Sequence, residues 1–125
     1  MNNRNGFFKG RLLAFKYAFQ GAWYLFKNEP PVKVQFITAL VVCAAGFYFD
    51  ITRTEWMLQL LSIGLVLSIE GCNTAIEKIA DFIHPEYHVK IGVIKDVAAG
   101  AVFIAATAAF IVGLIIYVPY FIALF

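Results

Sequence analysis

The last part of the chain, residues 97–125, contains no charged side chain. A helix that crosses a membrane needs about 20 consecutive, predominantly apolar residues, and the segment 97–118 is long enough to supply them. The composition agrees, because 62% of the residues are hydrophobic and 14% are charged, which is typical of a bundle embedded in lipid. The sequence therefore predicts an integral membrane protein.

Two further spans are expected ahead of this one. Pro30 and Pro31 interrupt the preceding helix, since proline lacks an amide donor and disfavours α geometry in the residue before it. The apolar segment 32–49 then predicts a first span, and a short polar turn separates it from a second span at 56–83. The expected fold class is an all-α integral membrane protein with three transmembrane helices in a single domain, 1–125.

The N-terminal segment 7–28 has the spacing of an amphipathic helix. Aromatic and leucine side chains recur every three or four residues on one face, while lysines and Gln20 lie on another. Such a helix suits the membrane surface, where it lies among the headgroups without crossing the bilayer. A soluble amphipathic helix that packs on a partner is the alternative interpretation.

Lysine and arginine are distributed unevenly along the chain. Six of the ten precede or open the first span, one lies in the following turn, and three lie around the connection before the third span. By the positive-inside rule, the N-terminus and the connection at 78–96 are expected in the cytoplasm. The net charge of +2 is too small to indicate a nucleic-acid partner.

The second span contains a row of polar side chains. Its members are spaced by three, four and four residues, which places them on one helical face: Glu70, Asn73, Glu77 and Asp81. A charged side chain at the centre of a bilayer costs about 2.5 to 3.5 kcal/mol on insertion scales. These groups are therefore expected to face protein, water or a ligand.

The two glutamates of this row are expected to have separate functions. At about 1.5 Å rise per residue they stand roughly 10 Å apart along the helix axis, too far for both to chelate one cation. Glu77 lies nearer the cytoplasmic boundary and suits a hard cation, for which Glu29 offers a second carboxylate. Glu70 lies deeper, at the level of a lipid hydroxyl, and suits a general base.

Lys95 and Asp96 precede the third span, on the same side as Glu77. Lysine offers a point charge to phosphate oxygens, although a surface anchor at Lys95 and an N-terminal helix cap at Asp96 are alternatives. Neither a GxxxxGK[S/T] loop nor a GxGxxG motif occurs, so any nucleotide site must be built differently.

Two other classes of protein are compatible with these residues. In a proton-coupled transporter or channel subunit, Glu70 would bind and release protons inside an oligomeric bundle. In a structural subunit, the carboxylates would pair with basic groups across an interface. A phosphate-handling enzyme would need Lys95 and Asp96 for its activity, whereas the spans of a transporter would tolerate their loss. These two residues therefore distinguish the two classes.

A specific signature covers the second and third spans. The chain reads E-G-C-N-T-A-I-E from Glu70 to Glu77, continues with Asp81 and P-E-Y-H at 85–88, and reads K-D-V-A-A-G-A-V from Lys95. In order and spacing it resembles the prokaryotic diacylglycerol kinase family, and the resemblance extends over nearly the whole chain.

The resemblance implies a lipid kinase of the bacterial inner membrane. It implies a homotrimer with active sites shared between neighbouring subunits, which transfers the γ-phosphate of Mg-ATP to a lipid alcohol. The matching positions imply that Glu70 is the catalytic base and that Glu29 and Glu77 bind Mg2+. The positions implied to lie near the nucleotide or its phosphates are Tyr17, Asn73, Glu77, Asp81, Gly92, Lys95 and Asp96.

The resemblance leaves two alternatives for the acceptor lipid. Well-known members carry a basic residue where this chain has Gly10, with Arg11 beside it, and the stretch that begins at Lys95 looks more like the branch that includes undecaprenol kinases. The expected acceptor is therefore either diacylglycerol, converted to phosphatidic acid, or undecaprenol, converted to undecaprenyl phosphate.

Overall fold

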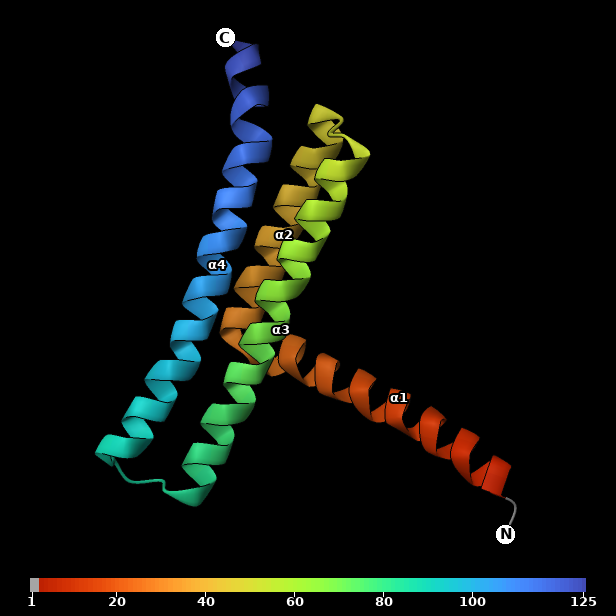
Figure 1. Cartoon of the computed structure of the whole chain (residues 1–125), viewed down its shortest axis with the longest axis vertical. Coiled ribbons are helices and arrows are strands. Elements are labelled where there is room, and N and C mark those ends of the chain that lie inside the picture. The colour runs from red at the N-terminus through yellow and green to blue at the C-terminus, as the bar shows by residue number, and fades with distance from the viewer. Residues whose placement is uncertain (1–2) are drawn as a thin grey trace.

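The computed structural model describes residues 3–125, with side chains described from residue 6 onward. Its helices follow in the order α1 (Asn3–Asn28), α2 (Pro30–Phe49), α3 (Arg53–Ile83) and α4 (Val89–Leu124). Figure 1 shows α2, α3 and α4 running along a common direction, while α1 leaves the bundle at a steep angle. By length and hydropathy, α2, α3 and α4 are each sufficient to cross a membrane. This confirms the predicted all-α membrane fold with three spans and an additional N-terminal helix.

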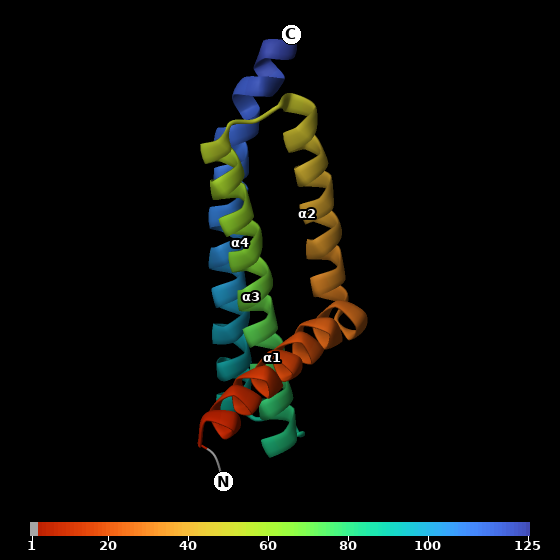
Figure 2. The same cartoon turned by 90° about the vertical axis from the view of Figure 1, so that its right-hand side faces the viewer.

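Two prolines set the boundary between α1 and α2. They occupy the first turn of α2, where no amide donor is needed, and Glu29 precedes them as an N-cap in extended conformation. The chain changes direction here, as Figure 2 shows, and the rings of Phe26 and Phe36 pack edge to face across the corner with centroids 4.9 Å apart. This contact fixes the end of α1 to the start of α2 and so holds Glu29 in place.

A tight turn at the opposite end of the bundle reverses the chain between α2 and α3. Asp50 adopts a left-handed conformation with φ of 51°, and Thr52 and Glu55 form a capping box at the start of α3. Gly46 permits the close approach of the two helices, because a Cβ atom there would lie 2.9 Å from the Trp56 ring. The turn therefore places α2 and α3 antiparallel.

Helix α4 is longer than the sequence predicted at both ends. It begins at Val89, where a connection as far as Lys95 was expected, because His88 caps it by accepting a hydrogen bond from the backbone N–H of Lys90 at 3.1 Å. It also continues through Pro119 to Leu124. At about 1.5 Å per residue its 36 residues measure about 54 Å, against about 30 Å for the hydrocarbon core of a bilayer. Because no charge follows Asp96, we assign the excess length mainly to the start of α4.

The interior of the bundle contains polar as well as apolar side chains, and its outer surface is apolar. Four of its buried side chains are polar or charged: Gln59, Glu70, Asn73 and Thr74. Large apolar side chains instead point outward, and Phe47 and Phe103 are 76% and 72% exposed. This arrangement is expected of a protein whose surroundings are hydrocarbon, because lipid accepts apolar side chains and rejects polar ones.

The aromatic face of α1 is not buried by the bundle. Phe8, Phe15 and Phe19 are all well exposed. Exposed aromatic side chains opposite lysines suit a helix that lies in the headgroup region. The location of α1 at the membrane surface stays a prediction.

A hydrogen-bonded cluster ties the three spans together near the α2–α3 turn. The Tyr117 hydroxyl on α4 lies 2.9 Å from the Val42 carbonyl oxygen on α2 and within hydrogen-bonding distance of the Gln59 amide oxygen on α3. The Gln59 amide nitrogen faces the Cys43 sulfur at 3.8 Å. Inside lipid these polar groups stabilise the bundle by satisfying one another.

We predict that Tyr117→Phe lowers the free energy of unfolding by about 1 kcal/mol, because it leaves buried polar atoms at Gln59 and Val42 without their donor. Equilibrium unfolding in mixed detergent micelles would measure the loss. Tyr48→Phe is the matched control, since Tyr48 is 75% exposed and removal of its hydroxyl is expected to change little. Equal effects of the two substitutions would contradict the cluster's stabilising role.

Candidate functional site

The buried face of α3 carries the polar row predicted from its spacing. Glu70, Asn73 and Thr74 are 6%, 8% and 6% exposed, so they face the interior of the bundle. The amide nitrogen of Asn73 donates a hydrogen bond to Glu77 at 3.2 Å, which links two members of the row one turn apart. The Glu70 carboxylate is thus directed towards protein, as the cost of exposing it to lipid requires, whereas Asp81 at the end of the row is exposed.

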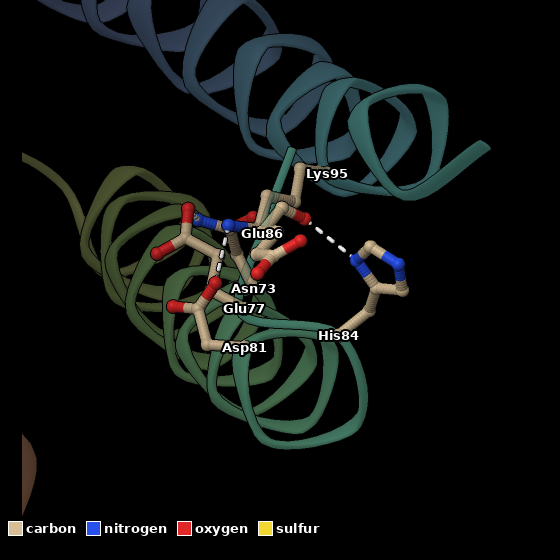
Figure 3. A network of polar contacts seen from close by, with 6 residues as sticks. All are labelled: Asn73, Glu77, Asp81, His84, Glu86 and Lys95. Carbon is tan, nitrogen blue, oxygen red and sulfur yellow. Dashed lines mark hydrogen bonds and ion pairs between the residues drawn. The ribbon is translucent and has the colours of Figure 1, made fainter. Parts of the chain in front are cut away.

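An ion pair joins the end of α3 to the start of α4. The Lys95 ammonium lies 2.5 Å from the Asp81 carboxylate, and Figure 3 shows both side chains next to Asn73 and Glu77. Their side chains are 37% and 60% exposed, and exposed pairs of this kind contribute about 0 to 1 kcal/mol to stability. The pair therefore places a cation and a carboxylate at the exposed end of the polar row. It contributes little to the stability of the fold.

The short connection between α3 and α4 is held by its own contacts. Nδ1 of His84 lies 2.6 Å from the Glu86 carbonyl oxygen, and the rings of His84 and His88 stand edge to face with centroids 5.3 Å apart. Because α4 begins at Val89, Asp96 lies well inside this helix. The alternative function of Asp96 as an N-terminal helix cap is therefore wrong, and His88 is the cap.

Glu29 reaches α3 from the corner between α1 and α2. Its carboxylate lies 3.6 Å from the Lys78 ammonium, which also stands 5.3 Å from the centre of the Tyr24 ring. The pattern of the second span did not single out Lys78, because it is not a member of the row spaced by three, four and four residues. The sequence does show a lysine directly after Glu77. Its pairing with Glu29 becomes apparent only in the folded protein, where the corner between α1 and α2 lies against α3.

Glu70 has a neighbour on α2 that spacing did not identify as part of the site. The Gln35 side chain faces the Glu70 carboxylate, and Glu29 and Glu77 are near enough for their charges to act on it. The three predicted carboxylates therefore converge on the same end of the bundle. Gln35 is the polar residue at the start of the first span, and its pairing with Glu70 depends on how α2 is packed against α3.

The oxygen atoms of this site suit a magnesium ion. The Asn73 side-chain oxygen is buried without a hydrogen-bond partner among the described residues, and the amide of the same side chain donates to the Glu77 carboxylate, while Glu29 is paired with Lys78. Within residues 3–125 no cluster of three or more His, Cys, Asp or Glu side chains forms a complete metal site. Mg2+ is commonly held by one or two carboxylates together with substrate phosphates, so an incomplete protein site fits this ion.

Two further predicted nucleotide positions are Tyr17 and Gly92. Tyr17 is an exposed residue of α1, and no hydrogen bond or ion pair in the described part of the chain connects it to the row on α3. Gly92 lies in the first turns of α4 beside Tyr87, whose ring would be 3.5 Å from a Cβ atom at that position. The chain by itself thus brings together Asn73, Glu77, Asp81 and Lys95, but leaves Tyr17 outside.

The fold and the site define a small multi-span membrane protein with a buried carboxylate on α3 and an exposed pair of a carboxylate and a lysine at one end of the bundle. The family model described as prokaryotic diacylglycerol kinase matches residues 16–117. The chain therefore belongs to the prokaryotic diacylglycerol kinase family, and it is a lipid kinase of a bacterial membrane.

Curated relatives agree with this assignment over most of their length. An undecaprenol kinase of Bacillus subtilis is 36% identical over 118 residues, which cover 94% of this chain and 93% of the relative. A diacylglycerol kinase of Haemophilus influenzae is 34% identical over 72% of this chain and 76% of its own. A diacylglycerol kinase of Escherichia coli is 31% identical over 88% of this chain and 89% of its own.

Proposed function

We propose that the protein transfers the γ-phosphate of Mg-ATP to the hydroxyl of diacylglycerol or undecaprenol. The observation that carries this proposal is the burial of Glu70 on the same face of α3 as Asn73 and Glu77, below the exposed pair of Asp81 and Lys95. One helix thereby connects a carboxylate within the bundle to charged groups at its end. A kinase for a membrane alcohol needs both, because its acceptor lies in lipid and its donor in water.

Glu70 is proposed as the general base. Proton removal from the acceptor hydroxyl requires a carboxylate at the depth where that hydroxyl lies. The Glu70 side chain is buried inside the bundle, beside Gln35 of α2. Positioning of this kind accounts for much of the catalysis in phosphoryl transfer, where the protein aligns the reactants and offsets their charge.

Glu29 and Glu77 are proposed to hold Mg2+, with the Asn73 oxygen close by. The ion supplies neutralisation of the charge that develops on the phosphates. Lys95 and Asp96 are proposed to lie along the phosphates, and Tyr17, Asp81 and Gly92 along the rest of the nucleotide. Within a single chain, the Lys78 ammonium lies beside the Glu29 carboxylate. This contact supports the proposal that a positive charge is favoured next to Glu29.

We further propose that the N-terminus and the site face the cytoplasm from the inner membrane. The basic residues of α1, of the start of α2 and of the two helix ends that flank the α3–α4 connection lie at the site's end of the bundle, which follows the positive-inside rule. ATP is available on that side. A homotrimer is proposed as the working assembly, because a neighbouring subunit could bring Tyr17 or its counterpart to the site.

The decisive assay incubates the purified protein with labelled ATP, Mg2+ and either diacylglycerol or undecaprenol in mixed micelles. We expect label in one or both lipids, and the ratio of the two rates identifies the preferred acceptor. A preparation lacking Mg2+ is the control for metal dependence. Label in neither lipid would exclude the proposed reaction.

We predict that Glu70→Gln lowers the rate of transfer roughly 100-fold to 10,000-fold, because the amide keeps the shape of the side chain but cannot accept the proton. Size-exclusion chromatography would confirm that the oligomer is retained. Glu55→Gln, which removes a carboxylate from the other end of α3, is expected to remain active. Full activity of Glu70→Gln would exclude Glu70 as the base.

We predict that Glu77→Gln raises the Mg2+ concentration needed for half-maximal activity and weakens ATP binding, since one ligand of the ion is lost. Magnesium titrations and the binding of a fluorescent ATP analogue would measure the two effects. Glu86→Gln, in the exposed connection, serves as the control. An unchanged magnesium titration would remove Glu77 from the metal site.

A further inference from the structure

Lys78 is the one charged side chain in residues 68–83 of α3 to which the proposed reaction assigns no task. It lies between two partners from the corner at which α1 meets α2. Its ammonium is 3.6 Å from the Glu29 carboxylate and 5.3 Å from the centre of the Tyr24 ring. These distances are those of an ion pair and of a cation–π contact. Lys78 is therefore held on the side of α3 that faces this corner.

An apolar contact supports the corner beside the ion pair. Leu25 packs directly over Gly71, where an added Cβ atom would lie 2.9 Å from the leucine Cδ1 atom. Leu25 and Glu29 are one helical turn apart, and the backbone N–H of Glu29 donates to the Leu25 carbonyl oxygen at 3.1 Å. The end of α1 thus rests on α3 and carries the Glu29 carboxylate to Lys78. This carboxylate side chain is only 20% exposed.

The two proposed metal ligands each have a nitrogen partner within the chain. Lys78 pairs with Glu29, and the amide of Asn73 donates to Glu77 at 3.2 Å. These two carboxylates and Glu70 are near enough to repel one another. The nitrogen partners offset that repulsion, but they are not equivalent, because an ammonium carries a full positive charge and an amide is neutral. Only the partner of Glu29 resembles a metal ion in charge.

We propose that Lys78 competes with Mg2+ for the Glu29 carboxylate and gives this carboxylate up when the ion binds. The inference rests on the proposed function, in which Glu29 and Glu77 hold Mg2+. Mg2+ binds its oxygen ligands at about 2.0 to 2.1 Å and requires nearly octahedral geometry. An ammonium beside the same oxygen repels the ion by its charge. Glu29 therefore cannot be a full partner of both cations.

The Tyr24 ring gives the released ammonium a second partner. The face of an aromatic ring attracts a cation, and the Lys78 ammonium already lies within contact distance of this one. The four-carbon stem of lysine is flexible, so a small movement of the side chain is sufficient to leave Glu29. The ammonium does not have to enter hydrocarbon, where a charge is costly.

The competition has a consequence for how the ion is taken up. Lys78 is 54% exposed, and an exposed ion pair of this kind lowers the affinity of Glu29 for the ion by at most about fivefold. A free ion must overcome this cost with protein ligands alone, whereas an ion that arrives with ATP brings phosphate ligands of its own. Lys78 thus favours the uptake of Mg2+ together with the nucleotide.

Two other functions of Lys78 lead to different results. A lysine near the membrane surface can be an anchor whose ammonium extends to water, and such an anchor would not affect ion binding. A lysine can also bind phosphate oxygens, in which case its loss would weaken ATP binding and leave the binding of the ion alone unchanged. Measurements of ion binding without nucleotide therefore separate the three functions.

The test titrates the purified protein in detergent with Mn2+ and follows binding by electron paramagnetic resonance. Mn2+ replaces Mg2+ as the probe because both ions prefer carboxylate, carbonyl and water ligands. We expect Lys78→Met, which keeps the length of the side chain but removes its charge, to bind Mn2+ about fivefold more tightly. Lys78→Arg keeps the charge and is expected to bind Mn2+ like the unaltered protein.

Lys90→Met is the matched control for the loss of one positive charge. Lys90 is an exposed residue at the start of α4, at the same end of the bundle as Lys78. Because salt screens the charges of exposed groups, we expect this substitution to change the Mn2+ affinity less than about twofold. Lys78→Gln replaces Lys78→Met if the latter fails to fold.

A second measurement needs no substitution. A carbodiimide joins a carboxylate directly to an amine that lies against it, and mass spectrometry of the digested protein identifies the joined residues. We expect a cross-link between Glu29 and Lys78 without added metal, and its loss at saturating Mg2+. The pair of Asp81 and Lys95 is the internal control. Its cross-link is expected in both conditions, because neither residue is proposed as a ligand of the ion.

The inference is overturned if Lys78→Met binds Mn2+ no more tightly than the unaltered protein, or if the cross-link between Glu29 and Lys78 persists at saturating Mg2+. Glu29→Gln distinguishes this result from a failure of the proposed metal site. Unaltered Mn2+ binding by Glu29→Gln would overturn the metal site at Glu29 and this inference with it. Weaker Mn2+ binding by Glu29→Gln, together with no effect of Lys78→Met, would overturn the competition alone.

Discussion

The structure depends on the exclusion of polar groups from hydrocarbon. Three helices in a bilayer gain little from packing apolar side chains together, because lipid receives those side chains equally well. The buried positions of Gln59, Glu70, Asn73 and Thr74 show what instead determines which faces meet. Helix α3 supplies all four of these side chains and turns them towards its neighbours, so the interior that stabilises the bundle is also the place where chemistry is available. Fold and site are therefore built from the same residues.

Much of this could be predicted from the sequence, because the relevant patterns are local. The two prolines after Glu29 set a helix boundary, and the uncharged segment after Asp96 requires a span. The row from Glu70 to Asp81 follows directly from helical periodicity, and the structure places Glu70 and Asn73 inside as expected. The signature that begins at Glu70 also indicated the family, and the match of residues 16–117 to the family model confirms it.

The remainder depends on contacts between distant segments. Nothing in the spacing indicated that Lys78 meets Glu29, or that Gln35 faces Glu70, since each pair joins helices separated by a turn. The start of α4 was misplaced for a local reason, because residues 89–95, which contain two lysines and Gly92, were assigned to the connection although they form the first turns of the helix after the His88 cap. Polarity marks the edge of a membrane, but a helix does not have to end there.

The shape of the bundle has a consequence for how substrates meet. Helix α1 departs at an angle (Figure 2), and α2 packs much less extensively than α4 against α3, so the flank between α2 and α3 has few contacts within the chain. An acceptor that enters by this flank never leaves the bilayer, and its encounter with the enzyme is a search in two dimensions. The quantity that governs saturation is then the mole fraction of acceptor in the membrane. Dilution by other lipids would slow the enzyme even when the amount of acceptor per volume is constant.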